Sequence, residues 1–111
     1  MCIAVYSPKG NNIPCEDYLH NCFDNNSDGA GFAFNLNGHV EIVKGFMTWT
    51  DFINTFREYD KSYCLKNRGV LIHFRIATHG KVDAANCHPF PVSDSNRLEN
   101  ANMPTCTHRA I

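Results

Sequence analysis

The sequence lacks an excess of charge, a long apolar stretch and the length for a second domain. Its 111 residues carry ten Lys and Arg against eleven Asp and Glu, a formal net charge of -1, so bulk electrostatics does not favour nucleic acid or an anionic membrane as partner. No apolar stretch approaches the ~18 residues of a membrane-spanning helix, and no basic segment followed by an apolar one opens the chain. We therefore expect a single cytoplasmic domain, residues 1–111, without a membrane or direct nucleic-acid partner.

Cysteine, by contrast, is abundant, with six residues in the chain accompanied by six histidines. Six cysteines suit either the disulfide framework of a small secreted protein or a set of reduced thiols. We expect reduced thiols, because no export signal is present and the aliphatic content can form a core unaided. The combination with histidine also raises metal binding as an alternative.

The N-terminal part of the chain alternates strand and helix patterns. Residues 2–7 are a β-branched and aromatic run that stops at a turn-rich cluster, which predicts a strand. After Pro14 the apolar residues recur at helical spacing, which predicts a helix over 14–23. Together these patterns indicate the α+β class.

Residues 30–45 predict a β-hairpin. Phe32 and Phe34 alternate at period two, and they precede Asn37-Gly38, the pair most typical of a two-residue hairpin turn. Apolar residues follow the turn and continue a partner strand.

A second helix and a buried strand are predicted next. Thr48 followed three residues later by Asp51 resembles a capping box, and an amphipathic stripe then begins at Phe52. Residues 69–75 are almost continuously apolar, which favours a central strand covered on both faces. Residues 81–111 are loop-rich, with a weak strand-like pattern over 105–111. The expected core comprises Phe32, Phe34, Val40, Ile42, Phe52, Phe56, Val70, Ile72 and Phe74.

Two residues stand out for their chemistry. Removal of Met1 would give Cys2 both a thiol and a free α-amine, the pair found in N-terminal nucleophiles, although a small buried strand residue is the simpler interpretation. Arg75 follows the predicted central strand, where a guanidinium can clamp a carboxylate through two hydrogen bonds or form a structural ion pair, for instance with Asp28.

Several segments resemble the class II glutamine amidotransferases, in particular the glutaminase domain of hexosamine-phosphate synthase and small stand-alone relatives in phages. The resemblance covers residues 1 to about 92 and rests on Met1-Cys2, on the 27–32 segment Ser-Asp-Gly-Ala-Gly-Phe, on Arg-Ile-Ala-Thr-His-Gly at 75–80 and on Asn-Cys-His-Pro at 86–89. It implies the αββα sandwich of N-terminal nucleophile hydrolases, shortened here to an antiparallel sheet with two helices.

The resemblance also implies roles for individual residues. Cys2 would be the thiol nucleophile that attacks the glutamine amide, and Arg75 would hold the substrate carboxylate. The loop that closes over bound glutamine would comprise Thr78, His79 and Gly80, and His88 would have a structural or gating role.

The chain departs from the family at the oxyanion hole. Family members carry a His-Asn-Gly motif after the His-Pro segment, whereas this sequence has His108-Arg109-Ala110, and the family's amine-binding aspartate has no counterpart before residue 111. Loss of one oxyanion donor typically costs ~10²–10³ in rate. We therefore expect a non-catalytic amidotransferase-like protein that binds a protein partner.

Two hypotheses for the function follow. From family context alone, the chain is a phage-encoded inhibitor of a host defence complex. The alternative is an active glutaminase that releases ammonia from glutamine, with donors from another chain. Self-association into a homo-oligomer would cover exposed sheet surface in either case.

We expect no cofactor, and bound zinc is the alternative. Cys87, Cys106 and His108 offer thiolate and imidazole ligands that could fasten the loop-rich C-terminal quarter. The competing interpretation is that these cysteines are small apolar residues of a reduced interior.

Overall fold

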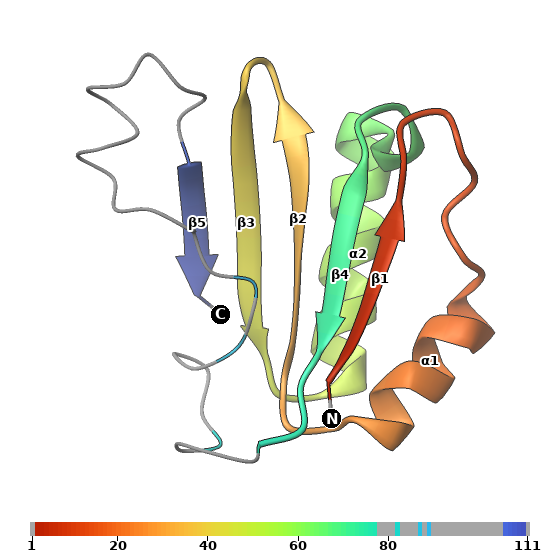
Figure 1. Cartoon of the computed structure of the whole chain (residues 1–111), viewed down its shortest axis with the longest axis vertical. Coiled ribbons are helices and arrows are strands. Elements are labelled where there is room, and N and C mark those ends of the chain that lie inside the picture. The colour runs from red at the N-terminus through yellow and green to blue at the C-terminus, as the bar shows by residue number, and fades with distance from the viewer. Residues whose placement is uncertain (1, 78–81, 83–86, 88, 90–105, 111) are drawn as a thin grey trace.

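A β-sheet with two helices on one of its faces makes up the described part of the chain (Figure 1). The computed structural model describes residues 2–77, Val82, Cys87 and Pro89, together with the backbone of residues 106–110. Its elements are β1 (Ile3–Ser7), α1 (Glu16–Asn25), β2 (Ala30–Leu36), β3 (His39–Phe46), α2 (Trp49–Tyr63), the 3-10 helix η1 (Leu65–Asn67), β4 (Val70–Phe74) and β5 (Cys106–Ala110). The α+β class is confirmed.

The strand order in the sheet is β1-β4-β2-β3-β5. The first four strands are antiparallel to their neighbours, as expected, but β5 runs parallel to β3, so the prediction of a purely antiparallel sheet is wrong at this edge. A parallel pair needs a long connection, and the chain between Phe46 and Cys106 is long enough to include α2 and β4. The predicted strand-like tail is confirmed as β5.

The β2–β3 hairpin turns at the predicted pair. Asn37 and Gly38 have φ angles of 49° and 86°, the left-handed conformation that a two-residue hairpin turn requires. The turn pairs Leu36 with His39 and so fixes the register of the hairpin back to Gly31, where the register shifts before Ala30.

This register corrects the expected core. Residues paired across the hairpin share a face, so Val43, opposite the core residue Phe32, faces the helices. Val40 and Ile42 lie on the other face; Val40 is half-buried, and Ile42 is buried outside the helix–sheet core. The prediction that Val40 is a core residue is wrong, because it followed apolar character rather than the alternation that the turn imposes, whereas Ile42 is buried as predicted but on the face away from the helices.

Helix α2 confirms both its predicted start and its predicted stripe. The backbone N–H of Asp51 donates to Thr48 Oγ1 at 3.2 Å, which caps the helix. Phe52, Ile53 and Phe56 are buried, and the Phe56 ring meets Phe32 edge-on with 5.0 Å between centroids. Eight of the nine expected core residues are buried, and seven of them lie in the core between the sheet and the helices, namely Phe32, Phe34, Phe52, Phe56, Val70, Ile72 and Phe74.

Helix α1 begins two residues later than predicted. Cys15 is its N-cap and has extended backbone angles (φ −64°, ψ 161°), so Pro14 precedes the helix instead of occupying its first turn. Acidic Glu16 then lies in the first turn, where the helix dipole favours it. Burial on the inner face raises the pKa of the Cys22 thiol, which keeps this thiol protonated.

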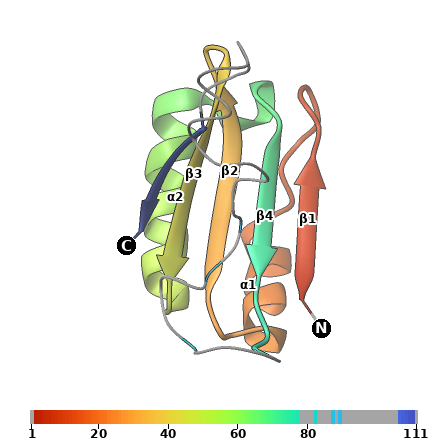
Figure 2. The ribbon, with the colours of Figure 1, turned by 60° about the vertical axis from the view of Figure 1, so that its left-hand side comes forward.

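The two helices are joined by an ion pair and lie on the same side of the sheet (Figure 2). Arg57 donates to both carboxylate oxygens of Glu16, and its Nε lies 2.7 Å from Oε2. This contact holds the pKa of the Glu16 carboxyl below its usual value.

The opposite face of the sheet is less well covered along β1 and β4. Alternate residues of β4 are fully buried and half-buried, so the predicted coverage of this strand on both faces holds only for the face toward the helices. Tyr6 of β1, on the less covered face, is 67% exposed. Neither α1 nor α2 is long and apolar enough to cross a membrane.

Candidate functional site

The first residues of β1 lie beside the last residues of β4. Antiparallel pairing of Ile3 with Phe74 brings Cys2 next to the segment that follows β4. The Cys2 side chain is exposed, and its Sγ lies 3.8 Å from the carbonyl oxygen of Ile76. Two of the segments that carry the family resemblance, far apart in sequence, therefore meet at this end of the sheet.

The segment before β2 joins the same end through four hydrogen bonds. The N–H of Asp28 donates to the carbonyl of Arg75 at 2.9 Å, and the N–H of Arg75 donates to the carbonyl of Gly29 at 2.8 Å. The Asp28 carboxylate accepts from the N–H of Ala77 at 2.8 Å. Asn26 donates through Nδ2 to the carbonyl of Phe74 at 3.2 Å. These bonds extend the sheet beyond Phe74 and fix the backbone around Arg75.

Arg75 itself is 5% exposed. A guanidinium buried to this extent requires hydrogen-bond partners, since the unpaired charge would be costly. The bond from Ala77 gives the Asp28 carboxylate a backbone partner, and both interpretations of Arg75, substrate clamp and structural ion pair, remain open.

Gly29 makes room for Cys87 at the same end of the sheet. A Cβ atom at Gly29 would lie 2.3 Å from Cys87 Sγ, and the φ angle of Gly29 is 130°. Cys87 is fully buried, and its Sγ lies 3.8 Å from Met47 Sδ. The segments around residues 28 and 87, which both contribute to the family resemblance, are thus in direct contact.

Lys44 adds a buried cation to this region. It is 5% exposed, and burial lowers the pKa of its ammonium group, while the nearby Cys87 thiol acts in the opposite direction. The sequence did not single out Lys44 or Asn26. The alternation of β3 could have placed Lys44 on the face away from the helices, but its neighbour Cys87 arrives from a distant segment.

Other predicted site residues lie outside the described part. This applies to Thr78, His79, Gly80 and His88. Of Cys106 and His108 the backbone alone is described, in β5 opposite Val40 and Ile42. Where side chains are described, no three His, Cys, Asp or Glu residues gather as metal ligands would. Zinc at Cys87, Cys106 and His108 stays a prediction.

The backbone of β5 locates the two residues that the resemblance aligns with the family's asparagine and glycine. Arg109 and Ala110 pair with Val43 and Lys44, on the strand farthest from β1. Four strand spacings of ~4.8 Å separate β1 from β5, or about 19 Å. The two residues are therefore well removed from Cys2.

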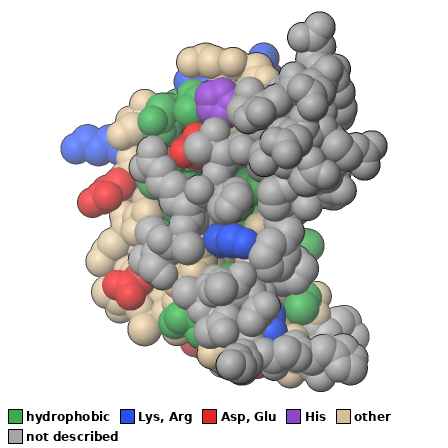
Figure 3. All heavy atoms as spheres, turned by 90° about the vertical axis from the view of Figure 1, so that its left-hand side faces the viewer, with side chains coloured by type: hydrophobic (Ala, Val, Ile, Leu, Met, Phe, Trp, Pro, Cys, Tyr) green, Lys and Arg blue, Asp and Glu red, His purple; other side chains and the backbone are tan. Residues whose placement is uncertain are grey.

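Charge on the side of the molecule nearest β5 is mixed. Figure 3 shows the described Lys, Arg, Asp and Glu side chains scattered over this face instead of gathered in a patch of one sign. The described side chains on that face form no continuous basic surface, which agrees with the formal net charge of -1.

Comparison with known proteins adds no relative. No family model, no curated protein and no solved structure matches the chain. The functional argument therefore depends on the motifs and on the way in which the structure brings them together.

Proposed function

We propose that this chain is a class II amidotransferase-like domain that binds glutamine at the Cys2 end of its sheet and does not hydrolyse it. The observation that carries the proposal is the meeting of Cys2, the Asp28–Gly29 segment and the Arg75–Ala77 segment. Three of the motifs behind the resemblance come together there, and the fourth arrives through Cys87. A shortened form of the αββα sandwich is part of this proposal; the described residues form one sheet and one helical layer.

Arg75 is the residue we assign to ligand recognition. Its backbone is held on both sides by hydrogen bonds to Asp28 and Gly29, so the backbone from which the guanidinium extends is fixed before a ligand arrives. A guanidinium recognises a carboxylate through paired hydrogen bonds.

Arg109 and Ala110 support binding without hydrolysis. An oxyanion hole requires donors ~3 Å from the oxygen that becomes charged. An alanine backbone N–H could still donate, but the strand order keeps this segment about 19 Å from β1 by strand spacing. In this proposal the chain retains the nucleophile position, while Arg109 and Ala110 lie too far from it to act as the donors.

Calorimetric titration with L-glutamine, run beside an ammonia-release assay, tests the proposal. We expect saturable binding without ammonia release, and binding weakened in Arg75→Lys, because an ammonium cannot form the paired hydrogen bonds of a guanidinium. Arg57→Lys is the matched control, since Arg57 lies on α2 and contacts Glu16. Absence of saturable binding, or equal weakening in both variants, would contradict the assignment.

An active glutaminase is the second candidate, favoured by the exposed Cys2 thiol at the head of β1. The intact mass must first show that Met1 is removed, because only then is the α-amine of Cys2 free to act as the general base. Ammonia release from glutamine that disappears in Cys2→Ala would then replace the binding proposal with the enzymatic one.

The hypothesis of a protein partner, including the inhibitor of a host defence complex, depends on family context. A pull-down with wild type and Arg75→Lys would show whether such a partner uses the Cys2 end. Capture by both proteins alike would place the partner surface elsewhere.

A further inference from the structure

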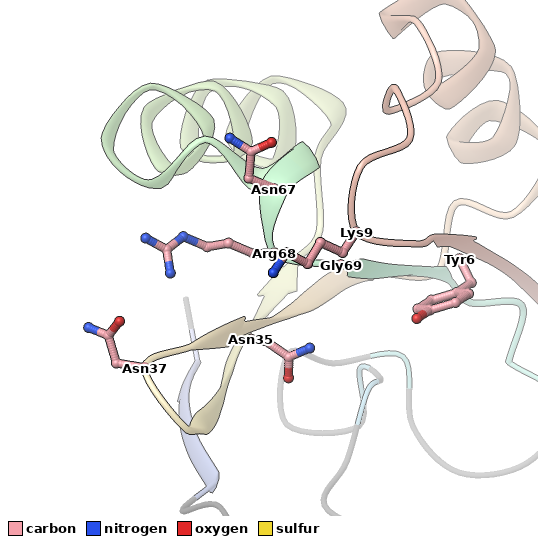
Figure 4. Close-up of a pocket in the computed structure, with 7 residues that line it drawn as sticks. All are labelled: Tyr6, Lys9, Asn35, Asn37, Asn67, Arg68 and Gly69. Carbon is pink, nitrogen blue, oxygen red and sulfur yellow. The ribbon is translucent and has the colours of Figure 1, made fainter.

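A hollow of about 280 Å³ lies at the end of the sheet opposite Cys2 (Figure 4). Three chain segments form it: the end of β1 with the turn that follows, the tip of the β2–β3 hairpin, and the connection between η1 and β4. The side chains that line it are Tyr6, Lys9, Asn35, Asn37, Asn67 and Arg68.

The lining is rich in hydrogen-bond donors and positively charged. Lys9 and Arg68 are cationic, three asparagines supply amide N–H groups, and none of the residues lining the hollow is acidic. Charge-assisted hydrogen bonds from such groups favour an anion. The overall charge of the chain is close to zero, so this local concentration is not a consequence of a basic protein.

Arg68 is held in place by contacts outside the hollow. Its Nε donates to the carbonyl of Tyr63 at 2.7 Å, and its guanidinium lies 5.7 Å from the centroid of the Tyr63 ring. A guanidinium has further N–H donors beyond Nε. Because the side chain is already restrained, binding an anion would cost little additional conformational entropy.

The backbone around the hollow is also fixed. The N–H of Gly10 donates to the carbonyl of Lys66 at 2.7 Å, which ties the turn carrying Lys9 to the segment carrying Arg68. Asn37 lies in the tight hairpin turn, and Gly69 has a φ angle of 73°, a conformation that favours glycine. The donors are thus carried by three segments of the chain that border one space.

We propose that this hollow binds the phosphate group of a small phosphate monoester. Donors that reach one space from three separate segments suit a tetrahedral anion, whose oxygens point in several directions. A planar carboxylate presents two oxygens and would engage fewer of them. The exposed ring of Tyr6 at the rim gives the esterified group an apolar surface. The inference is independent of glutamine binding at the other end of the sheet.

Titration with inorganic phosphate at constant ionic strength, followed by NMR of backbone and asparagine side-chain amides, tests the site. We expect saturable shifts at Asn35, Asn37 and Asn67. Lys9→Gln and Arg68→Lys should weaken binding roughly three- to tenfold, the effect of one exposed charge or one paired hydrogen bond. Lys61→Gln removes the same charge from an exposed position on α2 outside the hollow and should leave the affinity unchanged.

Thermal melting of each variant guards against a folding artefact, and Lys9 is exposed, so its variant should melt with the wild type. Shifts that do not saturate, or equal weakening by all three substitutions, would overturn the proposal. Binding of a short oligonucleotide that inorganic phosphate does not displace would also overturn it, in favour of a nucleic-acid surface.

Discussion

Gly29→Ala should destabilise the protein strongly, and Cys87→Ala should rescue part of that loss. The new Cβ would lie 2.3 Å from Cys87 Sγ, well inside van der Waals contact at ~3.5–4.0 Å. It would also lie 3.5 Å from Met47 Sδ, an ordinary contact. The substitution therefore combines one severe clash with the strain of a non-glycine residue at a φ angle of 130°.

The two contributions can be separated in size. A strained backbone conformation costs about 1–3 kcal/mol, and overpacking in a well-filled interior costs about 1–3 kcal/mol more. Gly29→Ala should thus lower the free energy of unfolding by about 2–6 kcal/mol, a large share of the ~5–15 kcal/mol typical of a domain. Removal of Cys87 Sγ leaves its Cβ 3.7 Å from the new methyl group, which is ordinary contact.

A double-mutant cycle measured by urea denaturation under reducing conditions checks this reasoning. Cys87→Ala alone should cost ~1 kcal/mol, and Gly29→Ala should cost about 1–3 kcal/mol less in its presence. Gly10→Ala is the matched control: the φ angle of Gly10 is 92°, and nothing lies within 4 Å of its added Cβ. Equal losses for Gly29→Ala and Gly10→Ala, both indifferent to Cys87→Ala, would refute the contact.

Three further predictions test the helices and the sheet. Phe56→Ala should lower the free energy of unfolding by ~3–5 kcal/mol because it opens a cavity in the aromatic core. Val40 is half-buried, so Val40→Ala should lower it much less. Similar losses for the two variants in thermal or urea denaturation would mean that the assigned faces are wrong. Thr48→Ala removes the N-cap of α2 and should cost ~1 kcal/mol, while Thr48→Ser should restore most of it. Because the pKa of Glu16 is lowered in the folded state, its carboxylate stabilises the fold at pH values above its unfolded-state pKa. This stabilisation is lost as the pH falls through the lowered folded-state pKa. The difference in unfolding free energy between wild type and Glu16→Gln, measured by urea denaturation, should therefore vanish in acid and persist at neutral pH.

Local pattern was enough to predict most elements of the fold. Asn37-Gly38 identified the hairpin, and the stripe beginning at Phe52 identified α2, because turns and amphipathic helices depend on neighbouring residues. The face of Val43 could also have been read from the sequence, since a two-residue turn fixes which residues oppose each other.

The positions of β4 and β5 could not be read in this way. Periodicity indicates that a segment is a strand, but it does not identify the strand's partners. Insertion of β4 between β1 and β2, and the parallel pairing of β5 with β3, depend on contacts between distant residues.

The same distinction between local sequence pattern and long-range contacts applies to the candidate site. Cys2 and Arg75 were selected from the sequence, and the antiparallel pairing of their strands brings their segments together. The sequence around neither Gly29 nor Cys87 indicates the contact between them, because this contact depends on how two separate loops approach each other. The burial of Cys87 agrees with the alternative of a small apolar interior residue.

The strand order has a consequence for how the protein folds. The β2–β3 hairpin closes from adjacent residues, whereas β1 can pair with its neighbour only after β4, more than sixty residues later, has been synthesised. During translation β1 therefore cannot pair with β4 until β4 is synthesised, and closing the long loop between the two strands is slow. Because β4 joins β1 to the hairpin, its arrival would complete the four antiparallel strands and bring Cys2 beside Ile76 in one event. Slowed hydrogen exchange of the β1 backbone amides during refolding would then track late assembly of these strands, not early collapse.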